Sequence, residues 1–172
     1  MIEKYSETWS AKFLAERDLI KSRLGDTALD IQHIGSTAVP GLTAKPIIDT
    51  MVAVPSVKDT EVFVPLLESI GYNHKPDMSS TERLFFRKGD PVEYHLSVGQ
   101  PDHTSYWERQ ILFRDYLIAH PECAREYESI KQEAINELEE GELVDLSQSK
   151  TYNEKKGPFI QKILELARRN QV

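Results

Sequence analysis

The apolar residues of this chain change their period along its length. Residues 6–24, residues 57–70 and the region from about Ser105 onward place apolar side chains about three or four positions apart, which is the period of an amphipathic helix. Between them lie short segments that are rich in Ile and Val or that alternate apolar and polar residues, as strands do. The predicted strands cover residues 29–34, 46–54, 83–88 and 92–98.

Capping and turn residues support these bounds. Ser6 suits the start of the first helix and Gly25 its end. Gly89-Asp90-Pro91 predicts a hairpin turn between the last two strands. The C-terminal helical signals are a Ser105-x-x-Glu108 capping box, a restart at Pro121 and a final segment near 152–169.

The order of these elements predicts an α+β fold, in which a small mixed sheet is covered by flanking helices and followed by a helical C-terminal part. The 172 residues include 40% hydrophobic and 28% charged side chains, which are ordinary values for a globular protein. Since no linker is long enough to divide the chain, we expect one domain over residues 1–172.

Composition excludes several classes of function. The single cysteine, Cys123, forms neither a disulfide framework nor a CxxC metal site, so we expect a reducing cytoplasm. We expect no signal peptide and no membrane span, because no stretch approaches about 20 apolar residues. A net charge of −7 disfavours a long nucleic acid as partner, but local cations and backbone amides could still bind a small anion.

The first candidate for chemistry is the loop after the first strand, His33-Ile34-Gly35-Ser36-Thr37. Backbone amides at Gly35 and the hydroxyls of Ser36 and Thr37 could bind phosphate oxygens, although an ordinary tight turn would show the same residues. The loop is not a P-loop, because Gly35, Gly41 and Lys45 do not have the required spacing.

The second candidate is Asp49, a carboxylate in the middle of the apolar strand 46–54. An unpaired charge buried there would be costly, so Asp49 needs a cation, a hydrogen-bond donor or a metal ion. A structural ion pair with Lys or Arg would meet that need, and so would Mg²⁺. Met51 shares a face of the strand with Asp49, but its thioether is a poor ligand for Mg²⁺.

The strand 92–98 alternates so that Glu93, His95 and Ser97 share one face. Glu93 could supply a second metal oxygen, and His95 could act as a base or contact phosphate, although a solvent-facing strand would look the same. Candidate phosphate-binding cations are Lys45, Arg83 and Arg87.

The run from His33 to Asp49, HIGSTAVPGLTAKPIID, resembles the signature of the GrpB family. Further segments resemble the family in the same order, and together they cover most of the chain: 85–88, 94–98, 113–117 and 152–160. The resemblance implies a nucleotidyltransferase-superfamily fold, and similar domains are joined to dephospho-coenzyme A kinases in some bacteria.

The resemblance also implies roles for particular residues. Gly35 and Ser36 correspond to the phosphate loop, and Asp49 corresponds to the first acid of an Asp-x-Asp or Asp-x-Glu pair that binds divalent metal. Two positions depart from the pattern. Met51 stands where the second acid is expected, and Ser97 stands where the family has the second histidine of a His-Leu-His run.

Three functions follow from these residues. The first is Mg²⁺- or Mn²⁺-dependent nucleotidyl transfer to a small acceptor, with Asp49, Glu93 and His95 as catalytic residues and with Asp49 and Glu93 as metal ligands. The second is a non-catalytic module that binds a nucleotide or another phosphometabolite. The third is a transition-metal hydrolase with a site assembled from His33 and His95, although the chain has no HxxxH or HExxH pattern.

Overall fold

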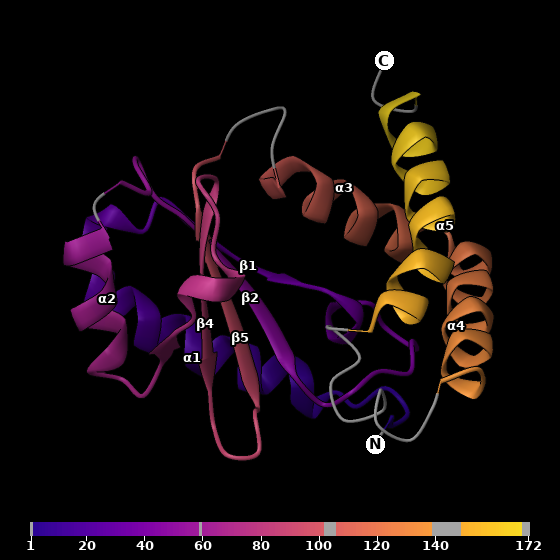
Figure 1. Ribbon diagram of the computed structural model, residues 1–172, viewed down its shortest axis with the longest axis horizontal. Helices are drawn as coiled ribbons and strands as arrows, with labels where there is room; N and C mark the ends of the chain where they lie inside the picture. Colours follow the sequence, from indigo (N-terminus) through magenta and orange to yellow (C-terminus); the bar gives the residue numbers. More distant parts are fainter. Residues whose placement is uncertain (1, 59, 102–105, 139–148, 170–172) are drawn as a thin grey trace. The chain divides into compact units, whose positions relative to one another are not determined.

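The computed structural model describes residues 2–58, 60–101, 106–138 and 149–169 (Figure 1). The chain divides into two compact units, Met1–Ile111 and Leu112–Val172. The single domain that we expect over residues 1–172 stays a prediction.

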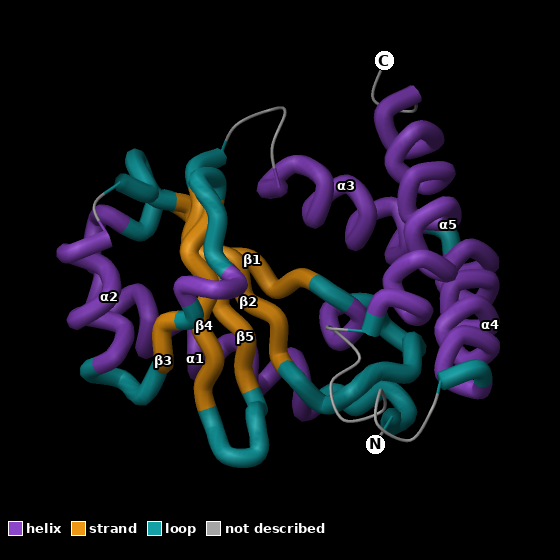
Figure 2. The backbone as a smooth tube through the Cα atoms, in the orientation of Figure 1, coloured by secondary structure: helices purple, strands orange, loops and turns teal. Residues whose placement is uncertain are grey.

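In its described part, the first unit contains a five-stranded mixed sheet (Figure 2). The strand order is β1-β2-β5-β4-β3, in which β2 and β5 are parallel and the other neighbours are antiparallel. The sheet and the β4–β5 hairpin confirm the sequence prediction, while the two-residue β3 is too short to have a strand pattern. The strands are β1 (Asp30–Ile34), β2 (Ile48–Ala53), β3 (Asn73–His74), β4 (Arg83–Lys88) and β5 (Tyr94–Gly99).

Two helices, α1 (Thr8–Leu24) and α2 (Thr60–Glu68), pack against one face of this sheet (Figure 1). Ile20 of α1 and Phe63 of α2 join a buried cluster with Val52, Leu96 and Phe86 of the strands. Both helices were predicted, within a few residues at each end. Short 3₁₀ turns connect the elements: η1 (Gly25–Thr27), η2 (Ser36–Ala38) and η3 (Pro76–Met78).

The register of the strands decides which side chains share the other face. Asp49 of β2 lies opposite His95 of β5, and Met51 lies opposite Ser97. Side chains alternate between faces along a strand, whereas directly paired residues share a face. Asp49, Met51, His95 and Ser97 therefore lie on the face away from the α1–α2 core, which we call the polar face.

The second unit is helical, as predicted. Its aromatic side chains pack together: the rings of Tyr127 and Phe159 stack at 5.5 Å, and Phe113 meets Tyr127 edge-on at 5.1 Å. Pro121 begins a helix as expected, whereas Ser105 of the predicted capping box lies outside the described residues. The helices are α3 (Tyr106–Ala119), which begins in the first unit, α4 (Pro121–Asn136) and α5 (Lys150–Arg169).

Across the parts of the chain that the structure describes, none of the helices has both the length and the apolarity that a bilayer span requires.

A buried ion pair joins α1 to β4 in the first unit. Both carboxylate oxygens of Glu16 accept hydrogen bonds from Lys88 Nζ, at 2.8 and 3.0 Å, and Glu16 is only 5% exposed. The same ammonium lies 5.3 Å from the ring centroid of Tyr72 and 5.4 Å from that of Tyr94. Burial, with Glu16 adding to it, raises the pKa of Tyr72, so this hydroxyl stays neutral beside the pair.

We expect Lys88→Met to lower the free energy of unfolding by about 3 kcal/mol, because it leaves the Glu16 carboxylate buried without its cation. Urea denaturation measures this loss. Lys12→Met is the matched control, since Lys12 forms an exposed ion pair worth about 1 kcal/mol or less. Equal losses for the two variants would contradict a strong dependence of Glu16 on Lys88.

Candidate functional site

The loop at the end of β1 lies directly against the carboxylate of Asp49. Gly35 has a positive φ of 71°, which favours glycine. A Cβ at this position would clash with Asp49 Oδ2 and would lie only 3.1 Å from both Cβ and Cγ of Asp49. Gly35 is therefore required for two reasons, and the predicted phosphate loop and the predicted acid adjoin in space.

His95 provides the hydrogen-bond partner that a carboxylate in this strand needs. Its Nδ1 donates to Asp49 Oδ1 over 3.0 Å, from the neighbouring parallel strand. The side chains of Asp49 and His95 are 35% and 16% exposed, so a ligand can still reach them. The imidazole also packs against the ring of Phe85, with 5.2 Å between the centroids. The hydrogen-bond partner of Asp49 is thus an imidazole, and not the Lys or Arg side chain that a purely structural ion pair would require.

Arg87 extends this pair into a row across three strands. It is directly paired with His95 in the β4–β5 register and therefore lies on the polar face. Its guanidinium carbon lies 6.0 Å from the ring centroid of Phe85. Neighbouring strands are about 4.8 Å apart, so the backbones of Asp49, His95 and Arg87 follow one another at that spacing.

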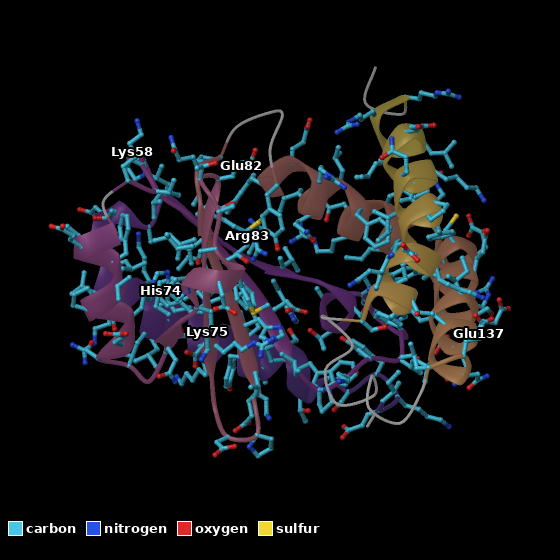
Figure 3. All side chains as sticks on the ribbon, viewed as in Figure 1. Lys58, His74, Lys75, Glu82, Arg83 and Glu137 are labelled. Atoms are coloured by element: carbon cyan, nitrogen blue, oxygen red, sulfur yellow. The ribbon has the colours of Figure 1, made fainter. Side chains whose placement is uncertain are left out.

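Arg83 shares the polar face with Arg87, as predicted, but its guanidinium belongs to a packed cluster. It donates a hydrogen bond to Ser97 Oγ over 3.2 Å and lies 4.9 and 4.8 Å from the ring centroids of Phe85 and Tyr106 (Figure 3 labels Arg83). Burial raises the pKa of Tyr106, whose hydroxyl is 3.4 Å from Ser97 Oγ. These contacts favour a packing role for Arg83 over the predicted phosphate contact.

Thr37 and His33 have structural contacts on the opposite side of the loop. The Thr37 hydroxyl is buried, donates to the Ile47 carbonyl over 3.3 Å and lies 3.0 Å from His33 Nε2. The ring of His33 stacks on Phe13 of α1, with 4.7 Å between the centroids. The Thr37 hydroxyl is therefore engaged in holding the loop, which argues against the predicted phosphate contact.

The pair of His33 and His95 on which the hydrolase hypothesis depends does not form. In the β1–β2 register His33 lies opposite Thr50, whereas Asp49 lies opposite Ile34. Because side chains alternate along a strand, His33 and His95 point to opposite faces of the sheet. Within the described ranges, no group of three or more His, Cys, Asp or Glu side chains is placed to hold a metal ion.

Glu93 is not brought together with Asp49 and His95, contrary to the expected shared face. The strand β5 begins only at Tyr94, and the Glu93 carboxylate lies 3.1 Å from Lys12 Nζ on α1. The polypeptide turns before the strand, so the alternation that we extended to residue 92 does not apply to Glu93. A metal-binding role for Glu93 has no support in this geometry.

The remaining predicted residues lie on the loop between β1 and β2. Ser36 begins η2 directly after Gly35, and Lys45 is partly exposed shortly before β2. Their phosphate contacts stay predictions. Tyr106 is a residue of the polar face that the sequence did not indicate, because its contact with Arg83 joins positions far apart in the chain.

Comparison with known proteins identifies the family. Residues 1–166 match the family model described as GrpB protein. The chain belongs to the GrpB family. It is 34% identical over 168 residues to the glutamate-rich protein GrpB of Alkalihalophilus pseudofirmus, covering 93% of this chain and 91% of that one. The crystal structure of the conserved protein GrpB from Enterococcus faecalis superimposes with a TM-score of 0.84 at 30% identity, over 99% of both chains.

Other relatives of the GrpB chain are longer. A UPF0157 protein of Pseudomonas aeruginosa is 41% identical over 128 residues, which are 72% of this chain and 52% of that protein, so the chain spans about half of its length. A dephospho-CoA kinase of Mycolicibacterium paratuberculosis is 30% identical over 151 residues, covering 73% of this chain and 37% of the kinase. The predicted similarity to a segment of such kinases is confirmed.

The predicted α+β fold, a small mixed sheet with flanking helices, is also confirmed. A more distant solved structure, that of the GLD-2/RNP-8 complex, matches with a TM-score of 0.56 at 10% identity, over 78% of this chain and 56% of that one. At that identity the likeness concerns the fold alone.

We expect Gly35→Ala to destabilise the protein by at least about 1 kcal/mol more than Gly41→Ala. Both glycines have positive φ, but a Cβ at Gly41 meets nothing within 4 Å, whereas one at Gly35 meets the Asp49 carboxylate. The difference between the two unfolding free energies in urea therefore isolates the contact with Asp49. Equal losses would show that the loop can move away from Asp49 at little cost.

Proposed function

We propose that the polar face binds a nucleotide or another small phosphorylated metabolite. The observation that carries this proposal is the contact of Gly35 with the Asp49 carboxylate, because it puts the loop beside the row of Asp49, His95 and Arg87. A phosphate chain would run from the amides of Gly35 and Ser36 across this row, with Arg87 neutralising the charge at its far end.

A phosphate chain beside a carboxylate needs a divalent cation between them. The residues fit one ion better than two. Asp49 is partly exposed, but Met51 in the second acid position is fully buried, and Glu93 is paired with Lys12. Asp49 would hold one Mg²⁺ or Mn²⁺, while phosphate oxygens and water complete its coordination, as is usual for Mg²⁺ in phosphate sites. The ion would offset the charge of the phosphates.

The reaction that this arrangement supports best is transfer of a nucleotidyl group to a small acceptor. The acceptor hydroxyl attacks the α-phosphorus and gives up its proton to water, while the bond to the bridging oxygen breaks and pyrophosphate leaves. Here the loop amides and Arg87 would orient the phosphates, and His95 would keep the Asp49 carboxylate in place. A net charge of −7 favours a small ligand over a long nucleic acid. The single cysteine favours a reducing cytoplasm as the place of action.

The second candidate function is binding without turnover. It is favoured by the side chain of Met51, which is 0% exposed and occupies the position of the second acid. A missing second carboxylate removes the second metal ion of a two-ion site, but it leaves the loop and Arg87 intact. Such a module would bind the same ligands and release them unchanged.

We expect Arg87→Gln to weaken nucleotide binding by about tenfold or more, because a charge-assisted contact to phosphate is lost. Isothermal titration with each of the four nucleoside triphosphates in MnCl₂ measures the affinity. The control is Arg17→Gln, since Arg17 pairs with Asp18 on the exposed side of α1. If the wild-type protein binds none of the four nucleotides, the proposed function fails.

We expect Asp49→Asn to reduce turnover by about 100-fold or more while retaining nucleotide affinity measured in EDTA. The amide keeps the size of the side chain but cannot hold a divalent ion. Pyrophosphate release from each triphosphate, with glycerol, sugars and amino acids as trial acceptors, measures turnover. Binding by the wild-type protein with no release of pyrophosphate would instead support the non-catalytic module, and loss of metal-free affinity in Asp49→Asn would contradict both models.

A further inference from the structure

The distance between Asp49 and His95 fits a metal ion as well as a hydrogen bond. Asp49 Oδ1 and His95 Nδ1 are 3.0 Å apart. On a six-coordinate ion with ligands at about 2.1 Å, two adjacent ligand atoms are also separated by about 3.0 Å. We propose that Asp49 and His95 together form a mixed oxygen and nitrogen site that binds Mn²⁺ in preference to Mg²⁺.

Both side chains are already held in the geometry that such a site needs. Gly35 lies against Oδ2 of Asp49, which leaves Oδ1 directed toward His95. The imidazole is only 16% exposed and rests on the ring of Phe85. Because β2 and β5 are adjacent parallel strands, the two backbones are fixed as well. The imidazole would bind the ion through Nδ1, so the proton that Nδ1 donates to Asp49 would leave it and the ring would carry its proton on Nε2.

The ligand types decide the preference among ions. Mg²⁺ favours an all-oxygen octahedral shell, whereas imidazole nitrogen favours transition ions. Mn²⁺ binds carboxylate and phosphate oxygens as Mg²⁺ does, and as a transition ion it also accepts an imidazole nitrogen, although Zn²⁺, Cu²⁺, Fe²⁺ and Ni²⁺ suit imidazole better. Within the described residues no third His, Cys, Asp or Glu joins the pair, so most positions on the ion stay open. That openness fits an exchangeable ion that phosphate can approach, and not a closed structural zinc site.

This inference deepens the proposed function, because it names the cofactor of the same site, but its test contains no nucleotide. MnCl₂ alone is titrated into the protein, and the loss of the free Mn²⁺ signal in electron paramagnetic resonance gives the affinity. Competition with MgCl₂ gives the preference. Pulsed electron paramagnetic resonance of the bound Mn²⁺ detects hyperfine coupling to a directly bound ¹⁴N nucleus.

We expect one bound Mn²⁺ with a ¹⁴N coupling, displaced only by MgCl₂ at about tenfold or greater excess. His95→Gln removes the coupling and weakens Mn²⁺ binding about tenfold or more, and Asp49→Asn abolishes binding. Asp18→Asn is the control, because this exposed carboxylate pairs with Arg17 on α1. If His95→Gln does not fold, the wild-type protein is labelled with ¹⁵N-histidine instead. We then expect the ¹⁴N coupling of the bound Mn²⁺ to be replaced by a ¹⁵N coupling.

The inference is overturned if Mn²⁺ does not bind, if it binds without nitrogen coupling, if the coupling persists in His95→Gln, or if Mg²⁺ competes equally. Its failure is distinguishable from failure of the proposed function. If the protein binds nucleotides but no nitrogen-bound Mn²⁺, only the mixed metal site is contradicted. If it binds a nitrogen-bound Mn²⁺ but no nucleotide, only the proposed nucleotide ligand is contradicted.

Discussion

The hydrogen bond between Asp49 and His95 is the interaction on which the polar face depends. Asp49 belongs to a strand whose other residues are all buried, and its own side chain is only 35% exposed, so its partly desolvated carboxylate is stabilised by a hydrogen-bond donor. The imidazole of the parallel neighbour supplies a donor, and Gly35 leaves room because it has no Cβ. The end of β1, the start of β2 and the start of β5 are therefore held together around one carboxylate.

Because side chains alternate along β4, its two neighbouring cations lie on opposite faces of the sheet. Lys88 points to the α1 side, where both oxygens of Glu16 bind it. Its neighbour in sequence, Arg87, points to the other face, beside His95. Two adjacent cations thus serve different purposes: one holds α1 on the sheet, and the other adds positive charge to the candidate site.

The polar face departs from a site built on paired carboxylates. Met51 occupies the second position without any capacity to bind a hard cation, and Glu93 is paired with Lys12 on α1. What lies beside Asp49 is an imidazole, and then a guanidinium. The row therefore provides one carboxylate, followed by an imidazole and a guanidinium, where a two-acid site would provide two carboxylates.

Local sequence determined the helices at both ends, the β4–β5 hairpin, the shared face of Asp49 and Met51, and the anomaly of a carboxylate among apolar residues, because these depend on periods and turns within a few positions. Only the tertiary structure decided the partners. Asp49 meets His95 across 46 positions, and Glu93 meets Lys12 across 81. The pairing of β2 with β5 is parallel and joins strands distant in sequence, so no short pattern encodes its register. That register, together with the absence of a Cβ at Gly35, turns separate polar residues into one site.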